Sequence, residues 1–258
     1  ARQDARIYDS ATMDLEQVME VMEQAERDGL TTVRLHTGDP CLYGAIREQM
    51  DCLDARGIEY DICPGVSSFC GAAAALGMEY TLPGISQSVV ITRMAGRTPV
   101  PERESIRRFA SHGSTMVIFL SAGMTGELSA ELMEGGYPGD TPAAIVYKAT
   151  WPDEKVVRCT VATLKEAAHR EGIHKTALIA VGDSVAQSSY ERSRLYDPAF
   201  TTGFRAGRDA VSGKQEPGTL YVVGMGPGER KQMTGQALEV MERCQVIAGY
   251  TVYVDLVR

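Results

Sequence analysis

The stretch LHTGDPCLYG, residues 35–44, decides how this chain is interpreted. It follows a β-branched run at residues 31–33 and leads into a predicted helix at residues 42–55. A strand that ends in a Gly-Asp-Pro turn exposes backbone N–H groups and one carboxylate at the edge of a sheet, where open α/β folds bind ligands. The alternative is a tight turn in which Asp39 caps the helix and Pro40 fixes φ at its first position.

The composition is that of a globular protein with an acidic balance. Of the 258 residues, 44% are apolar and 23% are charged, and the formal net charge is −8. This charge disfavours a nucleic-acid partner, which needs a basic face. No apolar run approaches the length of a membrane span. The cysteines and histidines lack metal-ligand spacing, so we expect no metal site. Cysteines without such spacing indicate free thiols, which are typical of the reducing cytoplasm. We therefore expect a cytoplasmic protein with no membrane partner.

Helix and strand patterns alternate along the first 87 residues. An amphipathic helix is predicted at residues 13–28, with Thr12 as its N-cap. Strands are predicted at residues 31–37 and 60–63, and a helix rich in alanine at residues 72–76. Such alternation predicts a parallel sheet with right-handed crossovers.

A second lobe is predicted from residue 88, and its sheet is expected to be mixed, with the third and fourth strands forming a hairpin. Its strands are expected at residues 89–93, 115–121, 143–150, 155–160 and 177–182, and its helices at residues 101–112, 125–134 and 163–170. Residues 205–218 have the composition of a linker.

A strand, a glycine turn and a helix are predicted again near the end, at residues 219–224, 224–228 and 232–243, with a further strand at 245–248. The turn reads GMGPG, in which Pro227 separates the second and third glycines, and residue 229 is Glu. This departs from the dinucleotide-binding pattern, so a nicotinamide site is disfavoured.

Five stretches together resemble the tetrapyrrole (precorrin) methyltransferase family, which uses S-adenosylmethionine as methyl donor. They are LHTGDP, PGVSS, IFLSAG, AAIVYKATWPDEKVVRCT and ALIAVGD, within residues 7–205. YKATWPDEK and YERSRLYDPAF make the resemblance strongest to members that act on corrin precursors. It implies a two-lobed α/β fold, with a parallel sheet in the first lobe and a mixed sheet in the second. It also implies a homodimer and an anionic tetrapyrrole substrate.

The resemblance has two departures. The family's opening strand and GxGPGD turn have no counterpart before Ile7, which implies that the first βα unit is missing. Conversely, residues 219–258 resemble the opening βαβ unit of another family member, and either fill that vacancy or remain unpartnered. The expected division is a first lobe at 1–87, a second lobe and tail at 88–204, a linker at 205–218, and the start of a second methyltransferase domain at 219–258.

The resemblance implies that the ends of strands hold S-adenosylmethionine, where Gly38 allows a close backbone approach. For Ser67 and Ser68 the alternative is capping of the following helix, and for Ala177 and Leu178 it is ordinary strand core. Asp39 and Tyr43 are the candidates for proton handling after methyl transfer. The full set expected to contact S-adenosylmethionine is Thr37, Gly38, Asp39, Ser67, Ser68, Leu120, Ala144, Ala177, Leu178 and Pro227.

A substrate with many carboxylates needs a local cationic surface on a protein of net charge −8. Arginine suits this task through its bidentate guanidinium. Arg47, Arg93 and Arg97 are the candidates, whereas Arg103, Arg107 and Arg108 are more typical of a solvated helix face.

The function that we expect is C-methylation of a corrin precursor with S-adenosylmethionine. Three alternatives stay open at this point. The chain could be a member of the sirohaem branch, a relative acting on RNA or protein, or an inactive or binding-only fragment.

Overall fold

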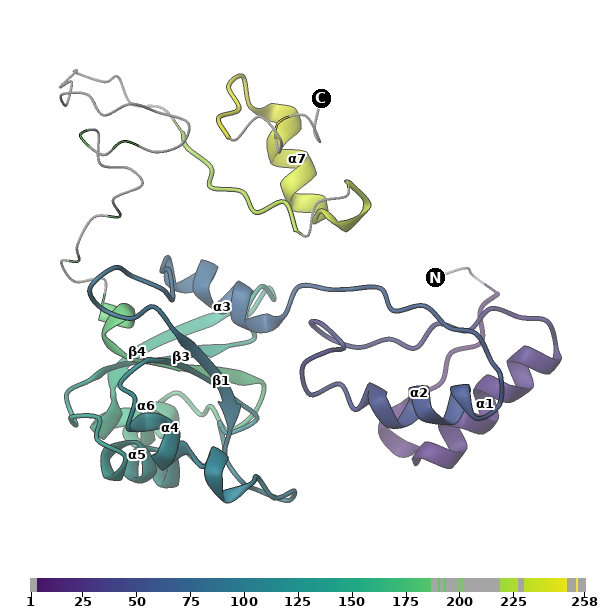
Figure 1. Cartoon of the computed structure of the whole chain (residues 1–258), viewed down its shortest axis with the longest axis horizontal. Helices are drawn as coiled ribbons and strands as arrows, with labels where there is room; N and C mark the ends of the chain where they lie inside the picture. The colour runs from purple at the N-terminus through teal and green to yellow at the C-terminus, as the bar shows by residue number, and fades with distance from the viewer. Residues whose placement is uncertain are drawn as a thin grey trace. The chain divides into compact units, whose positions relative to one another are not determined.

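A computed structural model of the chain describes residues 4–186, 190, 193, 199, 201, 219–226, 230–249 and 254 (Figure 1). The chain forms two compact units. The first unit comprises Ala1–Ser67 and Gln215–Arg258, and the second comprises Ser68–Lys214.

The second unit is built on one five-stranded mixed sheet with the order β1-β2-β5-β3-β4. β1 and β2 are parallel, whereas β5 is antiparallel to both β2 and β3. The mixed sheet and the β3–β4 hairpin confirm the sequence predictions. The strands are β1 (Val89–Arg93), β2 (Thr115–Phe119), β3 (Pro142–Tyr147), β4 (Lys155–Thr160) and β5 (Ala177–Val181).

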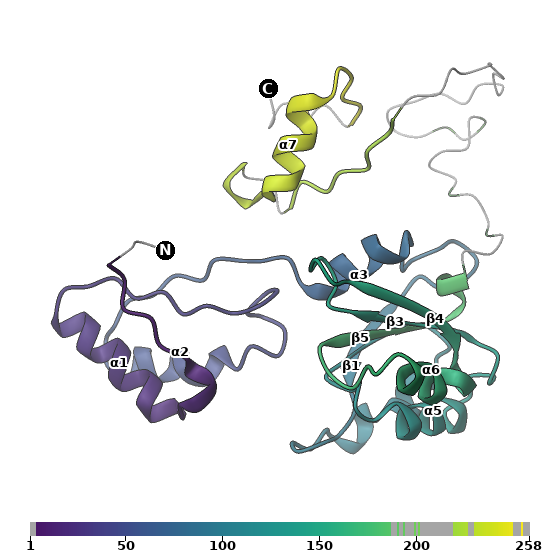
Figure 2. The same ribbon diagram turned by 180° about the vertical axis from the view of Figure 1, so that it is seen from behind.

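Helices cover both faces of this sheet, because its strands alternate apolar side chains between two cores (Figures 1 and 2). Met116 and Ile118 pack toward α4, α5 and α6, whereas Val117 packs toward α3. The helices are α3 (Ser68–Leu76), α4 (Ile106–Ala110), α5 (Thr125–Glu134) and α6 (Leu164–Arg170). Short 3-10 turns lie at Glu102–Glu104, Val161–Thr163 and Asp183–Ala186.

Helix α3 is tied to the sheet by Arg158 of β4. Its Nη2 donates to the Leu76 carbonyl at 2.8 Å, and its Nη1 donates to the Val185 carbonyl at 2.9 Å. α3 therefore belongs with the second unit, although the sequence analysis placed residues 72–76 in the first lobe. The lobe boundary at residue 88 stays a prediction.

The first unit contains α1 (Leu15–Arg27), α2 (Ile46–Asp54) and α7 (Gly235–Arg243), with 3-10 turns at Ser10–Thr12 and Arg230–Gln232. The N-cap of α1 is Asp14, not Thr12 as predicted, because Asp14 and Gln17 form a reciprocal capping box. Arg56, which follows α2, forms an ion pair with Glu23 of α1.

The strands predicted in the first unit are not formed among its described residues. Residues 31–37, 60–63, 219–224 and 245–248 have no β-ladder, and so the parallel sheet predicted for the first lobe is absent from the described structure. Val33 is 75% exposed and Val222 is 96% exposed. The physical reason is that a strand is stabilised by a paired neighbour and a covered face, which β-branched residues cannot supply alone.

Three predicted helices begin at least three residues later than expected. α2 begins at Ile46 rather than at residue 42, α4 at Ile106 rather than at 101, and α7 at Gly235 rather than at 232. The residues before each observed start lie in turns, in 3-10 segments or in irregular backbone. In the described part of the chain, no helix is long and apolar enough to span a bilayer.

Candidate functional site

Asp39 joins two turns of the first unit that are distant in sequence. Its Oδ1 accepts the Cys41 N–H and its Oδ2 accepts the Gly65 N–H, both at 2.8 Å. The Cys41 thiol, the Cys41 N–H and the Gly65 N–H lower the pKa of Asp39. The carboxylate therefore stays ionised at neutral pH, and its main contacts are to backbone.

The same two turns approach more closely than a side chain would permit. A Cβ added to Gly65 would lie 2.1 Å from the Gly38 carbonyl oxygen, and Gly38 itself has φ of +69°. Both glycines are therefore required by the backbone. We call Gly38, Asp39, Cys41 and Gly65 the turn clamp.

Tyr43 and Ala45 continue this segment with left-handed backbone, at φ of +56° and +50°. Ala45 is the N-cap of α2 and makes no side-chain capping bond, so the alternative in which Asp39 caps the helix is wrong. Left-handed non-glycine residues are costly and gather where function requires them. Tyr43 is 43% exposed, and Thr37 is also exposed.

The second unit has its own concentration of left-handed residues. Leu120, Lys148, Thr150 and Thr176 all have positive φ, between +46° and +71°. They follow β2 and β3 or precede β5, and the antiparallel pairing of β5 with both neighbours brings these ends to one edge of the sheet. We call this edge the strained edge. Its clustering marks a candidate ligand surface.

Leu120 places an exposed apolar side chain on the strained edge, since the residue is 69% exposed. Ala177 is half-buried at the start of β5, whereas Ala144 and Leu178 are buried in the core cluster under α3. A small exposed apolar surface beside fixed backbone is a candidate contact for an apolar part of a ligand. Contacts of Ala144 and Leu178 with S-adenosylmethionine stay a prediction. The burial of both side chains in the core does not favour it.

The loop after β1 carries the two arginines expected to bind substrate. The Arg93 guanidinium donates to the carbonyls of Met94, Thr98 and Pro99 at 3.1, 3.2 and 2.9 Å. Arg93 therefore braces the loop, while Arg97 is exposed within it. The structure thus gives the two guanidinium groups different surroundings, and substrate binding by either arginine stays a prediction.

Ser121 is a structural residue of this edge that the sequence analysis did not single out. Its Oγ accepts the Met94 N–H at 2.9 Å and donates to the Phe119 carbonyl at 2.7 Å, fully buried. It thereby ties the end of β1 to the end of β2. The signal was a serine at the end of the apolar run in IFLSAG.

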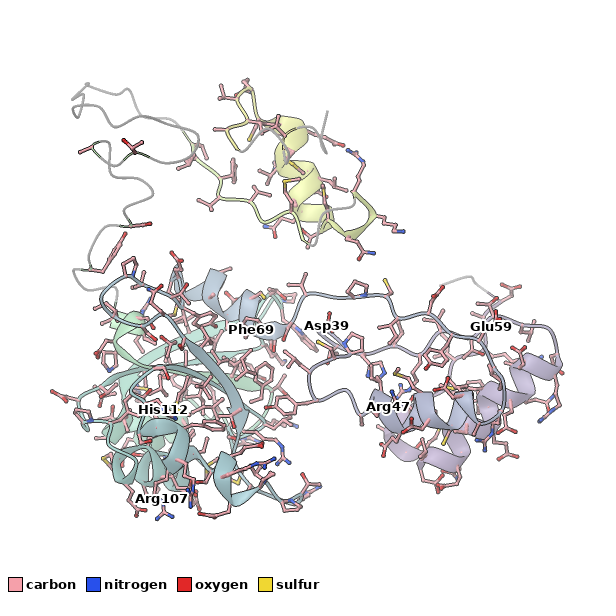
Figure 3. All side chains as sticks on the ribbon, viewed as in Figure 1. Asp39, Arg47, Glu59, Phe69, Arg107 and His112 are labelled. Carbon is pink, nitrogen blue, oxygen red and sulfur yellow. The ribbon has the colours of Figure 1, made fainter. Side chains whose placement is uncertain are left out.

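The remaining candidates are placed as follows. Arg47 pairs with Asp51 on α2. Ser67 is buried and Ser68 begins α3. Pro227 lies outside the described residues. Arg107 points away from the sheet (Figure 3) and pairs with Glu102 and Glu134, and Arg108 pairs with Glu102. These two arginines lie on a solvated helix face as predicted, whereas Arg103 lies in the preceding 3-10 turn.

Comparison with known proteins decides the family. Residues 1–165 match the model of the tetrapyrrole (corrin/porphyrin) methylases. The chain belongs to this family. It is 50% identical over 204 residues to the cobalt-precorrin-4 C(11)-methyltransferase of Methanocaldococcus jannaschii, covering 79% of each chain.

Two further relatives are also similar to this chain. The crystal structure of a cobalt precorrin-4 methyltransferase is 44% identical, with a TM-score of 0.70, covering 72% of this chain and 77% of that one. The uroporphyrinogen-III C-methyltransferase of Bacillus subtilis is 31% identical over 180 residues, covering 70% of each chain. The fold is therefore the mixed α/β fold of tetrapyrrole methyltransferases, as the sequence analysis predicted.

Proposed function

We propose that this chain is an S-adenosylmethionine-dependent methyltransferase that methylates C11 of precorrin-4, or of its cobalt form, in cobalamin biosynthesis. The observation that carries the proposal is the 50% sequence identity to a cobalt-precorrin-4 C(11)-methyltransferase over 79% of both chains. The strained edge and the turn clamp support it, because each offers preorganised backbone, and methyl transfer depends on holding donor and ring in position. We further propose that the enzyme is a cytoplasmic homodimer that binds no nucleic acid.

S-adenosylmethionine, when bound, supplies a methyl group on a positively charged sulfur that a ring carbon of the substrate can attack. The residues of this chain then have to hold both reactants in line and exclude water. Asp39 holds the turn clamp, since its carboxylate already accepts two backbone N–H groups. Tyr43, exposed on the left-handed turn, is left as the candidate for moving a proton after transfer.

The ligand prediction is that S-adenosylmethionine binds and NAD does not. GMGPG does not complete a dinucleotide pattern, whereas residues 1–165, which include the turn clamp, match the model of a methylase family. Isothermal titration calorimetry with each ligand measures this, and S-adenosylhomocysteine should compete with S-adenosylmethionine. Binding of NAD but not of S-adenosylmethionine would contradict the proposal.

Replacing Arg97 by alanine should raise KM for the tetrapyrrole while leaving the S-adenosylmethionine affinity intact. One exposed charge pair with a substrate carboxylate contributes about 1 kcal/mol, or roughly fivefold in KM. Steady-state kinetics with the substrate varied measures the change. Arg108→Ala, which removes the same charge from the helix face, is the matched control.

Arg93→Ala should behave differently, because it also releases three loop carbonyls. Its effect on thermal stability should exceed that of Arg97→Ala. Equal KM effects with unchanged melting temperatures in both variants would refute the separation of their roles.

A further inference from the structure

The tip of the β3–β4 hairpin, residues 148–154, is an unusually constrained turn. Lys148 and Thr150 both have left-handed backbone, at φ of +46° and +71°. The Trp151 N–H donates to the Lys148 carbonyl at 2.9 Å, and the Glu154 N–H donates to the Trp151 carbonyl at 3.0 Å. Such strain in non-glycine residues persists only where the surroundings hold it.

The surroundings hold this tip from several sides. The Lys148 N–H donates to the carbonyl of Thr176, at the start of β5, at 2.9 Å. The Thr150 N–H donates to Glu154 Oε2 at 2.6 Å. A Cβ added to Gly71 of α3 would lie 2.9 Å from Thr150 Cγ2, so helix and tip are in close contact.

These contacts fix an exposed aromatic side chain. The Lys148 Nζ lies 2.5 Å from Asp153 Oδ2, 5.2 Å from the centre of the Tyr147 ring and 5.3 Å from that of Trp151. Trp151, the only tryptophan of the chain, is nevertheless 52% exposed. The ammonium thus positions the indole by a cation–π contact while much of its surface remains open to solvent.

The hairpin tip belongs to the strained edge. β2 and β3 are both antiparallel to β5, so Leu120 and Lys148 follow strands that end at the same side of the sheet. The loops there are also closely packed, since a Cβ on Gly123 would lie 3.2 Å from the His174 carbonyl oxygen. An exposed, preorganised indole at this edge has the properties of a binding platform, because its ordering costs little entropy.

We propose that Trp151 is a stacking platform for the conjugated pyrrole rings of the tetrapyrrole substrate, held in position by Lys148 and Asp153. The proposal rests on the proposed function for the class of its ligand. A conjugated ring system can stack on the open face of an indole, whatever the metal content of the ring. Because Lys148 is paired with Asp153, its part is that of a positioning residue rather than of a carboxylate ligand.

The test uses the full chain and two independent readouts. Uroporphyrin III, a stable polycarboxylate tetrapyrrole, should quench the single tryptophan fluorescence saturably, without any turnover. In the methyl-transfer assay, Trp151→Ala should raise KM for the tetrapyrrole about tenfold, with kcat and S-adenosylmethionine affinity unchanged. Trp151→Phe should restore most of the loss, and Tyr8→Ala, which removes another exposed aromatic ring, should have no effect.

Lys148→Met should raise KM by a smaller factor and shift the tryptophan emission, because the indole loses its cation while the side-chain stem is kept. A Trp151→Ala enzyme that methylates with unchanged KM for the tetrapyrrole would overturn the platform and leave the proposed function intact. The same holds if Trp151→Ala weakens S-adenosylmethionine binding as much as it raises KM, since the tip would then be only structural. Saturable binding of uroporphyrin III without any methyl transfer by the wild-type chain would instead overturn the proposed function. A loss of uroporphyrin III affinity in Trp151→Ala, measured by calorimetry, would then still support the platform, and an unchanged affinity would overturn it.

Discussion

Replacing Gly65 by alanine should reduce the affinity for S-adenosylmethionine at least tenfold and lower the melting temperature of the protein. The added Cβ would lie 2.1 Å from the Gly38 carbonyl oxygen, which is backbone and cannot rotate away. The two turns must then separate, and the Gly65 N–H loses its bond to Asp39. Overpacking of this kind costs about 1–3 kcal/mol, and an orphaned N–H costs a further amount of about 1–3 kcal/mol.

Calorimetry and thermal unfolding followed by circular dichroism measure the two effects. Gly235→Ala is the matched control, because a Cβ on Gly235, at the start of α7, meets nothing within 4 Å. It should leave the S-adenosylmethionine affinity unchanged and should not lower the melting temperature. A Gly65→Ala protein with wild-type affinity and wild-type melting would show that the turn clamp is not needed.

Asp39→Asn should weaken S-adenosylmethionine binding by about 1–3 kcal/mol, roughly 5- to 150-fold. An amide presents one NH2 group to the two backbone donors that the carboxylate now satisfies, so one N–H is left without an acceptor. Asp61→Asn removes the same charge from an exposed position of the same unit and is the control. Calorimetry on the two variants separates the clamp from a general effect of charge.

The pH dependence of this difference follows from the lowered pKa of Asp39. A carboxyl whose pKa is depressed on folding contributes its stabilisation above its ordinary pKa of about 4, and loses it as pH falls through the depressed value. The difference in S-adenosylmethionine affinity between wild type and Asp39→Asn should therefore be constant from pH 8 to pH 5. It should close only in stronger acid. A gap that closes between pH 7 and pH 6 would assign it to another group.

Local pattern was enough to predict much of the sheet of the second unit. The sequence prediction matched α5, β1 and β4 residue for residue, because each is set by periodicity and by neighbours close in the chain. The same β-branched pattern at residues 31–37 did not give a strand, since Val33 and Leu35 have no paired neighbour to cover them. Propensity can be seen in a sequence, whereas a partner strand depends on the rest of the molecule.

The candidate site was predictable to a similar extent. The Gly-Asp-Pro turn identified Gly38 and Asp39, but nothing in the spacing indicated that Gly65, 26 residues later, donates to the carboxylate. Lys148 and Thr150 carry left-handed backbone without a glycine or asparagine to signal it. Such features arise from tertiary packing around the hairpin, so they required the structure.

The most direct test of the proposed activity is methyl transfer from isotopically labelled S-adenosylmethionine to three separate substrates: precorrin-4, cobalt-precorrin-4 and uroporphyrinogen III. Mass spectrometry should find one added methyl group on precorrin-4 or its cobalt form, placed at C11 by NMR, with an equal amount of S-adenosylhomocysteine. Uroporphyrinogen III should remain unmethylated. Methylation of uroporphyrinogen III alone, or of no tetrapyrrole by a folded protein that binds S-adenosylmethionine, would contradict the account.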